Sequence, residues 1–278
     1  MKKLIFTILT MVFALLSAAS AQEIVNGESQ VLIQLPLDSL TEQQLNDSLC
    51  HAKTSAEIEA LLYAGANPNA DSHDWGSPLC NAVEKEIQRG TQLLIDFGAQ
   101  DLSKALRYAP NGDFVDFLVK NGADVNWACE DGTALNAWAM ANYSACEALL
   151  KNGADPNSID SINGTTPLCD TWDPEIALLL IKNGANVNFQ AQTGNCIGAT
   201  PLHMAIDFYR YEVARVLLYP DPNNRKITRE NFNKMVNPFI KDNNGLMPID
   251  NVPKGHRPFR RTLKRYMRRY KACAKQFQ

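Results

Sequence analysis

The sequence predicts an all-α solenoid of about six helix-turn-helix repeats with finger-like turns. A hexapeptide recurs almost unchanged at residues 121–126 (NGADVN), 152–157 (NGADPN) and 183–188 (NGANVN), and its glycines lie 31 residues apart. A leucine-rich segment with helical spacing precedes each copy. A polar turn and a second helix-start signal follow the copies, as in GTTPLC and GATPLH. Such short helix pairs cannot bury their apolar stripes alone, so neighbouring pairs must stack into one core.

Capping residues mark where the helices begin and end. The leucine-rich segments end in Lys-Asn-Gly, a stop signal, because lysine suits the negative helix end and glycine adopts a left-handed conformation easily. Ser144 and Glu147 form a predicted capping box. Asp173 followed by Pro174 predicts an N-cap with proline in the first turn. Each unit therefore contains two helices joined by a short turn.

Two segments carry a family resemblance. Residues 198–205 (GATPLHMA) fit G-x-T-P-L-H-x-A, and residues 149–157 (LLKNGADPN) fit L-L-x-x-G-A-D-x-N. On these residues the chain resembles the ankyrin repeat, over the stretch from residue 40 to residue 260. The resemblance implies an L-shaped stack, in which the turns project as fingers from a two-layer helical wall. It also implies that His203 makes a structural hydrogen bond within its repeat.

Some units depart from the pattern. Only 24 residues separate Gly98 from Gly122, which predicts a unit that has lost most of its finger. The GTALN segment at 132–136 lacks the proline found in its counterparts. Residues 219–235 replace an expected hexapeptide, which predicts an insertion carrying a short helix.

The N-terminus predicts export. Two lysines precede an apolar run from Leu4 to Leu16, and residues 19–21 (ASA) have the small-x-small arrangement that signal peptidases cleave. The apolar run is shorter than the roughly 20 residues of a spanning helix, so a retained anchor is the less favoured alternative. We therefore expect a signal peptide cleaved after Ala21 and a mature protein that is periplasmic or secreted.

The domain organisation follows from these patterns. Residues 1–21 form the predicted signal peptide, and 22–37 form an N-terminal extension. Ankyrin repeats with partial caps are expected over 38–260. Residues 261–278 form a predicted basic C-terminal helix that extends the last repeat.

Charge is distributed unevenly along the chain. Residues 251–278 contain ten basic residues and no acidic one, whereas residues 22–250 contain 15 basic and 30 acidic residues. Apolar residues of the tail recur at helical spacing, which predicts either a capping helix with its charges in water or a helix that docks on an anionic membrane surface. Nucleic acid is not an expected partner of an exported protein. The candidate residues for anionic-surface binding are Arg260, Arg261, Lys264, Arg265, Arg268 and Arg269.

Motifs for catalysis or metal binding are absent from the sequence, including G-x-S-x-G, H-E-x-x-H, C-x-x-C and a phosphate-cradling glycine loop. The four histidines are too scattered to predict a metal site. The seven cysteines are an odd number, and equivalent cysteines of different repeats, such as Cys80 and Cys169, are too far apart for a disulfide. We therefore expect no catalytic residue, metal, cofactor or small-molecule substrate. An enzyme is the least favoured class, with residues 219–240 as the place for its site.

Apolar side chains in the fingers are the predicted partner contacts. Trp127 and Phe189 directly follow a hexapeptide, where a small or polar residue would suffice for solubility, and Trp75 and Ile159 lie in other finger turns. Aromatic anchors in polar surroundings are typical of binding hot spots. The alternative is that these side chains pack on the neighbouring finger. The sequence favours a non-catalytic protein–protein interaction module in the cell envelope, which binds an unidentified protein through its fingers and concave helix face.

Overall fold

The computed structural model describes residues 40–71, 76–220, 228–229, 232 and 234–277. The predicted signal peptide, the N-terminal extension and Trp75 lie outside these residues. Over the described ranges, no helix is both long enough and apolar enough to cross a membrane.

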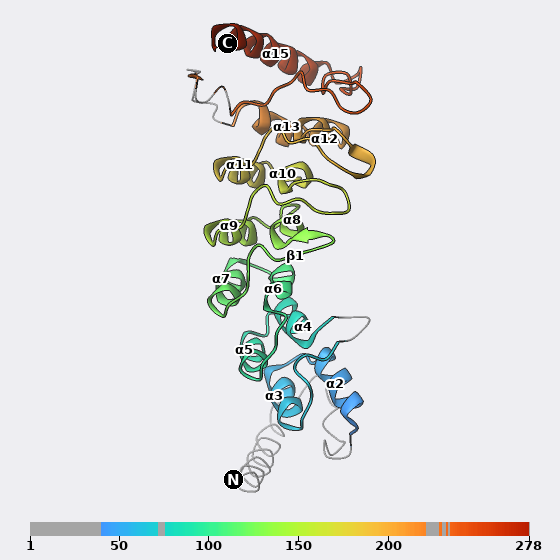
Figure 1. Ribbon diagram of the computed structural model, residues 1–278, viewed down its shortest axis with the longest axis vertical. Helices are drawn as coiled ribbons and strands as arrows, with labels where there is room; N and C mark the ends of the chain where they lie inside the picture. Colours follow the sequence, from blue (N-terminus) through green and yellow to red (C-terminus); the bar gives the residue numbers. More distant parts are fainter. Residues whose placement is uncertain (1–39, 72–75, 221–227, 230–231, 233, 278) are drawn as a thin grey trace, which may run out of the picture.

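Six helix pairs follow one another along the stack in the described part of the chain, and each consists of an inner helix, a short turn and an outer helix (Figure 1). This arrangement confirms the predicted all-α solenoid. The pairs are α2 (Glu42–His51) with α3 (Ser55–Tyr63), α4 (Pro78–Glu84) with α5 (Gln88–Asp96), α6 and the 3-10 helix η2 (Leu102–Ala105 and Leu106–Tyr108) with α7 (Gly112–Lys120), α8 (Ala134–Trp138) with α9 (Tyr143–Lys151), α10 (Pro167–Asp170) with α11 (Pro174–Lys182), and α12 (Pro201–Asp207) with α13 (Tyr211–Leu218).

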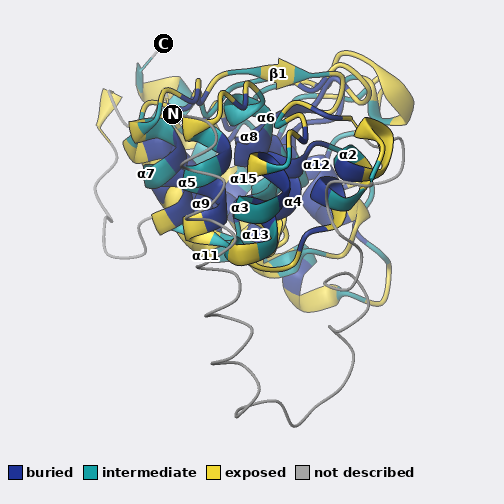
Figure 2. Cartoon of the chain, turned by 90° about the horizontal axis from the view of Figure 1, so that it is seen from below, coloured by how far each residue is buried: buried dark blue, intermediate teal, exposed yellow. Residues whose placement is uncertain are grey.

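One continuous hydrophobic core runs along the stack. It extends from Leu45 in α2 to Tyr266 near the C-terminus, and it includes Leu149 and Ile176, whose side chains are fully buried. Seen along the stack, the buried residues lie between the two helix layers (Figure 2). Stacking thus buries the apolar stripe of each pair, as the periodicity predicts.

Capping residues set the helix boundaries. Asp173 is the N-cap of α11, as predicted, and accepts a hydrogen bond from the Glu175 backbone N–H at 2.7 Å. α9 differs from prediction, since it begins at Tyr143 and Asn142 supplies its cap in place of Ser144. The asparagine side chain satisfies the same unpaired backbone N–H groups that a serine would satisfy.

The hexapeptide recurs because it both ends an outer helix and bonds the next repeat. Gly153 has a φ of 89°, a left-handed conformation that favours glycine. Asp155 holds the turn by accepting a hydrogen bond from the Asn157 backbone N–H at 2.8 Å. The Asn157 side chain then donates to Gly184 O at 3.1 Å and accepts from the Asn186 backbone N–H at 2.7 Å. The asparagines that make the same pair of bonds to the following turn are Asn69, Asn126 and Asn188.

The third pair has no finger, as the short glycine spacing predicts. Only residues 97–101 connect α5 to α6. No asparagine occupies the bridging position there, and the Asp124 backbone N–H donates instead to the Ser103 hydroxyl at 2.9 Å. A side chain on the inner helix thus replaces the missing finger contact.

The finger before α8 contains a short antiparallel hairpin, formed by β1 (Ala128–Cys129) and β2 (Gly132–Thr133). Asn136 provides the helix-start contact in this repeat, which lacks the proline. Its Oδ1 accepts hydrogen bonds from the Thr133 backbone N–H at 3.0 Å and from the Thr133 hydroxyl at 2.9 Å.

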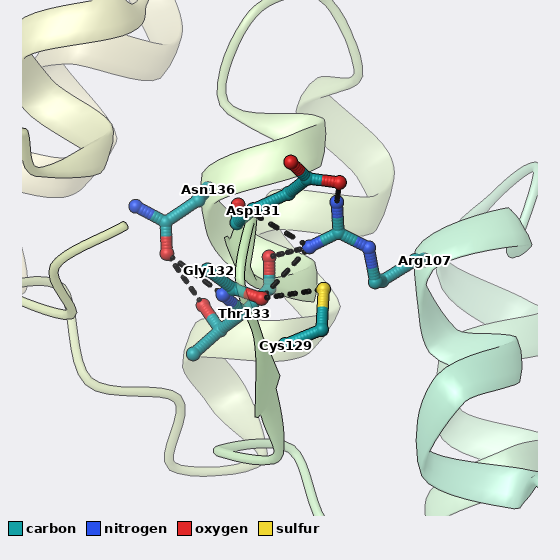
Figure 3. Close-up of polar contacts among 6 residues, drawn as sticks. All are labelled: Arg107, Cys129, Asp131, Gly132, Thr133 and Asn136. Atoms are coloured by element: carbon teal, nitrogen blue, oxygen red, sulfur yellow. Dashed lines mark hydrogen bonds and ion pairs between the residues drawn. The ribbon is translucent and has the colours of Figure 1, made fainter. Parts of the chain in front are cut away.

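Arg107 of the fingerless third pair holds this hairpin in place (Figure 3). Its Nη1 donates to Gly132 O at 2.8 Å and to Thr133 O at 3.1 Å, and its Nη2 lies 3.7 Å from an Asp131 carboxylate oxygen. The guanidinium therefore links two neighbouring repeats through backbone carbonyls.

The stack ends in one long helix, α15 (Arg257–Phe277), which forms the last layer in Figure 1. The predicted start of the C-terminal helix at residue 261 falls inside this helix. The hydroxyl of Tyr266 donates to Val236 O at 2.8 Å. The buried side chains of α15 are Phe259, Leu263 and Tyr266. α15 therefore closes the hydrophobic core as a cap.

The inserted segment between α13 and α15 is described only in part. In the region of the predicted short helix, the described residues show one hydrogen bond, from the Phe232 backbone N–H to Thr228 O at 2.9 Å. Residues 221–227, with 230, 231 and 233, lie outside the described residues.

Candidate functional site

The predicted finger anchors differ in exposure. Trp127 is half-buried, and Ile159 is 41% exposed. Phe189 is half-buried, and its ring packs against a small cluster of buried residues that includes Cys169 and Met204. Phe189 therefore fits the alternative prediction, in which a finger side chain packs on the neighbouring repeat. Partner binding by Trp127, Ile159 and Trp75 remains a prediction.

The basic residues predicted for surface binding also divide into two groups. Arg260 is half-buried, and its Nη2 donates to Ile249 O at 3.0 Å and to Val252 O at 3.4 Å. Arg260 thus holds the turn before α15 and does not reach outward, and Arg269 is also half-buried. The exposed members of the predicted set are Arg261, Lys264, Arg265 and Arg268.

A hollow of about 280 Å³ lies between the fingers and the inner helices of the fifth and sixth pairs. The fingers before α10 and α12 form one side, and the turn after α12 forms the other. Its lining residues are Asn163, Thr165, Asp170, Asn195, Cys196, Met204, Phe208 and Arg210. Residues of two neighbouring repeats therefore line the same hollow.

Three exposed aromatic residues lie in the turns next to this hollow, of which Phe208 lines it and Trp172 contacts its Arg210. Trp172 is 52% exposed, Phe208 46% and Tyr209 68%. All three occupy the turns between inner and outer helices of the fifth and sixth pairs. We term the hollow and these three rings the aromatic-rimmed groove. Large apolar side chains left in water at a recess are typical of interaction sites.

Arg210 is the fixed cation of the aromatic-rimmed groove. Its Nη1 donates to Cys169 O at 3.0 Å and to Thr171 O at 3.1 Å, so it also caps the end of α10. The guanidinium carbon lies 4.0 Å from the centre of the Trp172 ring and 4.9 Å from that of Phe208. Burial lowers the pKa of Arg210, but a guanidinium remains charged in proteins. Its Nε has no acceptor among the described residues.

A hydrogen-bonded carboxyl pair lies beside this cation. The Thr165 hydroxyl is 2.5 Å from an Asp160 carboxylate oxygen and 2.7 Å from one of Asp170. The Thr165 hydroxyl therefore bridges the two carboxyl groups.

The surroundings shift the pKa values of the two carboxyl groups in opposite directions. Burial raises the pKa of Asp170. Burial also acts to raise the pKa of Asp160, but hydrogen bonds from Thr165 and from backbone N–H groups outweigh it and lower that pKa. Arg210 is the one basic residue among those that line the hollow.

Tyr209 is held in a strained backbone conformation. Its φ is 59°, in the left-handed region, where a non-glycine residue costs about 1 to 2 kcal/mol. Glu86, with a φ of 58°, occupies the corresponding turn of the second pair. The Tyr209 ring contacts Tyr211 with its centroid 6.3 Å away but stays largely in water. A strained and exposed aromatic residue is a pattern of functional sites.

The described part of the chain offers neither a metal-binding cluster nor, at Cys50, Cys146 and Cys169, a reactive thiol. No cluster of His, Cys, Asp and Glu residues there is arranged to hold a metal ion. Burial raises the pKa of the Cys50 and Cys169 thiols to about 11 and that of Cys146 to about 12. These thiols are protonated at neutral pH and are therefore poor nucleophiles.

Trp172, Phe208, Tyr209 and Arg210 are not among the predicted partner contacts. The predicted contacts lie in the fingers, whereas these residues lie in the turns between inner and outer helices. A usable signal was present in the segments TWDP (171–174) and FYRY (208–211), where aromatic residues fill positions that a tight turn leaves exposed.

Comparison with known proteins gives matches to repeats of one kind. Residues 135–230 match the family model described as ankyrin repeats, in three copies. The Ankyrin repeat and KH domain-containing protein mask-1 of Caenorhabditis elegans is 31% identical over 160 residues, which cover 55% of this chain and 6% of that protein. The Putative ankyrin repeat protein L86 of Acanthamoeba polyphaga mimivirus is 29% identical over 171 residues, which cover 52% of this chain and 27% of that protein. The chain therefore spans well under two thirds of either relative.

Proposed function

Because the chain carries ankyrin repeats, which are generally protein–protein interaction modules, we propose that it is a non-catalytic binding protein whose partner protein docks in the aromatic-rimmed groove. The observation that supports this most is the Arg210 guanidinium placed beside the exposed rings of Trp172 and Phe208 in one hollow. Tryptophan, tyrosine and arginine are the residues enriched in binding hot spots. Ankyrin-repeat proteins are typically non-catalytic, which agrees with the raised pKa values of the buried cysteine thiols.

The groove suits a segment that carries an apolar side chain next to a carboxylate or carbonyl oxygen. The rings supply apolar contact area, and the Arg210 guanidinium beside them supplies a positive charge. Hydrogen bonds join the two repeats at the groove, from the Gln192 backbone N–H to Gly164 O and from Arg210 to Cys169 O, so binding requires little ordering of the protein.

The test is quantitative affinity capture from a cell-envelope extract, read by mass spectrometry. The groove variant combines Trp172→Ala with Tyr209→Gly. Its matched control combines Tyr63→Ala, an exposed ring on an outer helix, with Glu86→Gly, the equivalent strained turn. The groove variant loses two aromatic rings and the control loses one, and each variant relieves one left-handed non-glycine residue. Capture of the partner is expected to fall at least tenfold in the groove variant only, because truncating a hot spot costs about 2 kcal/mol or more.

Identical capture by the groove variant, the control and the wild type contradicts this assignment. A third variant, Trp127→Ala with Phe189→Ala, tests the finger anchors that the sequence selects. If a captured protein is lost from this variant alone, the binding site lies in the fingers and not in the aromatic-rimmed groove. Since Phe189 packs on a buried cluster, its unfolding midpoint must be measured first.

We also propose that the protein is exported and acts in the cell envelope or outside the cell. The lysines, the apolar run and the small-x-small sequence of residues 1–21 support this. N-terminal sequencing of the mature protein is expected to begin at Gln22, and Ala19→Arg is expected to block that cleavage. A cytosolic protein that retains Met1 contradicts export.

A further inference from the structure

A row of cations covers one face of α15. Their positions span about 100° around the helix and about 27 Å along it, from 100° and 1.5 Å per residue. All six side chains are exposed, and residues 251–278 contain no acidic residue. We term this row the basic stripe: Arg257, Arg261, Lys264, Arg265, Arg268 and Lys275.

The opposite face of α15 is fully used by the stack. Phe259 and Tyr266 are each 1% exposed and Leu263 is fully buried. The helix therefore has no free apolar face to insert among lipid chains, and any surface it meets must be recognised through charge. This separates the structure from an ordinary amphipathic membrane helix, which buries its apolar face in the bilayer.

The cations of the basic stripe form no ion pair with the acidic residues of the described repeats. Among the described residues, each ion pair lies elsewhere in the stack, between Arg89 and Glu59, Arg107 and Asp131, Lys151 and Asp116, or Arg215 and Glu212. The stripe thus presents its charge to solvent at one end of the described stack. No further layer follows α15 in the described part of the chain (Figure 1).

We infer that the basic stripe docks the stack on an anionic phospholipid surface by electrostatics alone. A plane of lipid headgroups can meet all six cations at once, because they lie along one face of a terminal helix. Residues 22–250 carry twice as many acidic as basic residues, so repulsion turns the rest of the stack away from that plane. The stripe contains no aromatic ring on which bases could stack, which disfavours single-stranded nucleic acid. This surface is distinct from the aromatic-rimmed groove.

The test is co-sedimentation of the full chain with phosphatidylcholine vesicles, with and without phosphatidylglycerol, at low and high salt. Neutral vesicles account for any binding by the apolar N-terminal run. The stripe variant is Arg261→Gln, Lys264→Gln, Arg265→Gln and Arg268→Gln. The control is Lys53→Gln, Lys120→Gln, Lys182→Gln and Lys241→Gln, four exposed lysines spread along the stack that give the same change of net charge.

Binding to anionic vesicles is expected to fall on the order of 100-fold in the stripe variant, because each cation near an anionic surface contributes several-fold. High salt is expected to abolish it, and the control is expected to retain most of it. Equal loss in both variants, equal binding to neutral vesicles, or no anionic binding by the wild type overturns the inference. Tighter binding to duplex DNA than to vesicles in the same buffer also overturns it. Circular dichroism of both variants checks that they fold.

Discussion

Leu263→Ala is expected to lower the free energy of unfolding by about 3 kcal/mol, within the range measured for truncating a fully buried leucine. Leu263 is fully buried in α15 and belongs to the continuous core. Urea unfolding followed by circular dichroism measures the change. Lys264→Ala, at the neighbouring exposed position, is the control and is expected to have little effect.

An unchanged midpoint for Leu263→Ala would mean that α15 is not part of the cap. The same packing has a practical consequence for membrane experiments. Truncation after Val252 removes the cations together with Phe259, Leu263 and Tyr266, so it opens the core and confounds a binding assay. Substituting exposed cations alone avoids this problem.

His203→Ala is expected to destabilise the protein by about 2 to 3 kcal/mol, because it leaves buried backbone groups without partners. The His203 ring is fully buried. Its Nδ1 accepts from the Thr200 backbone N–H at 3.1 Å, and its Nε2 donates to Leu246 O at 3.0 Å. This geometry agrees with the structural role that the family resemblance implies. Thermal unfolding at neutral pH measures the loss.

His203 also predicts a pH dependence. Burial lowers its pKa, and this outweighs the opposing effects of the Leu246 carbonyl and of the Asp242, Asp207 and Asp250 carboxylates. In the unfolded chain the imidazole titrates near its ordinary pKa of about 6.5, so the unfolded state takes up a proton first as pH falls. Its contribution to stability is therefore complete above about pH 6.5 and declines below it.

The comparison of wild type with His203→Ala isolates this contribution, since the other titrating groups are common to both. The stability difference between the two proteins is expected to shrink as pH falls below about 6.5. Parallel stability curves across this range contradict a buried neutral imidazole. Burial raises the pKa of Asp170, which affects both curves alike, whereas Asp207 interacts with the His203 imidazole and therefore contributes to the measured difference.

Local signals in the sequence were enough to predict the solenoid. The spacing of Gly122, Gly153 and Gly184 sets the repeat length, and proline and N-cap signals mark the helix starts. The lost finger of the third pair follows from the same spacing. These features were predictable because helix ends, turns and apolar periodicity depend on residues close together in the chain.

The candidate site depended on contacts between residues far apart in the chain. Phe189 and Phe208 are both phenylalanines beside a repeat motif, yet one packs on a buried cluster and the other is 46% exposed at the groove. Arg210 reaches Cys169 and Thr171 across about 40 positions of sequence. In the tail, Arg260 turns inward to backbone carbonyls while Arg261 faces solvent.

The sequence by itself thus determined the number and order of the helix pairs, because each pair carries its own start and stop signals. Only the tertiary structure decided which rings and cations remain exposed. Exposure is a property of the neighbours that stacking brings to a side chain, and those neighbours come from other repeats.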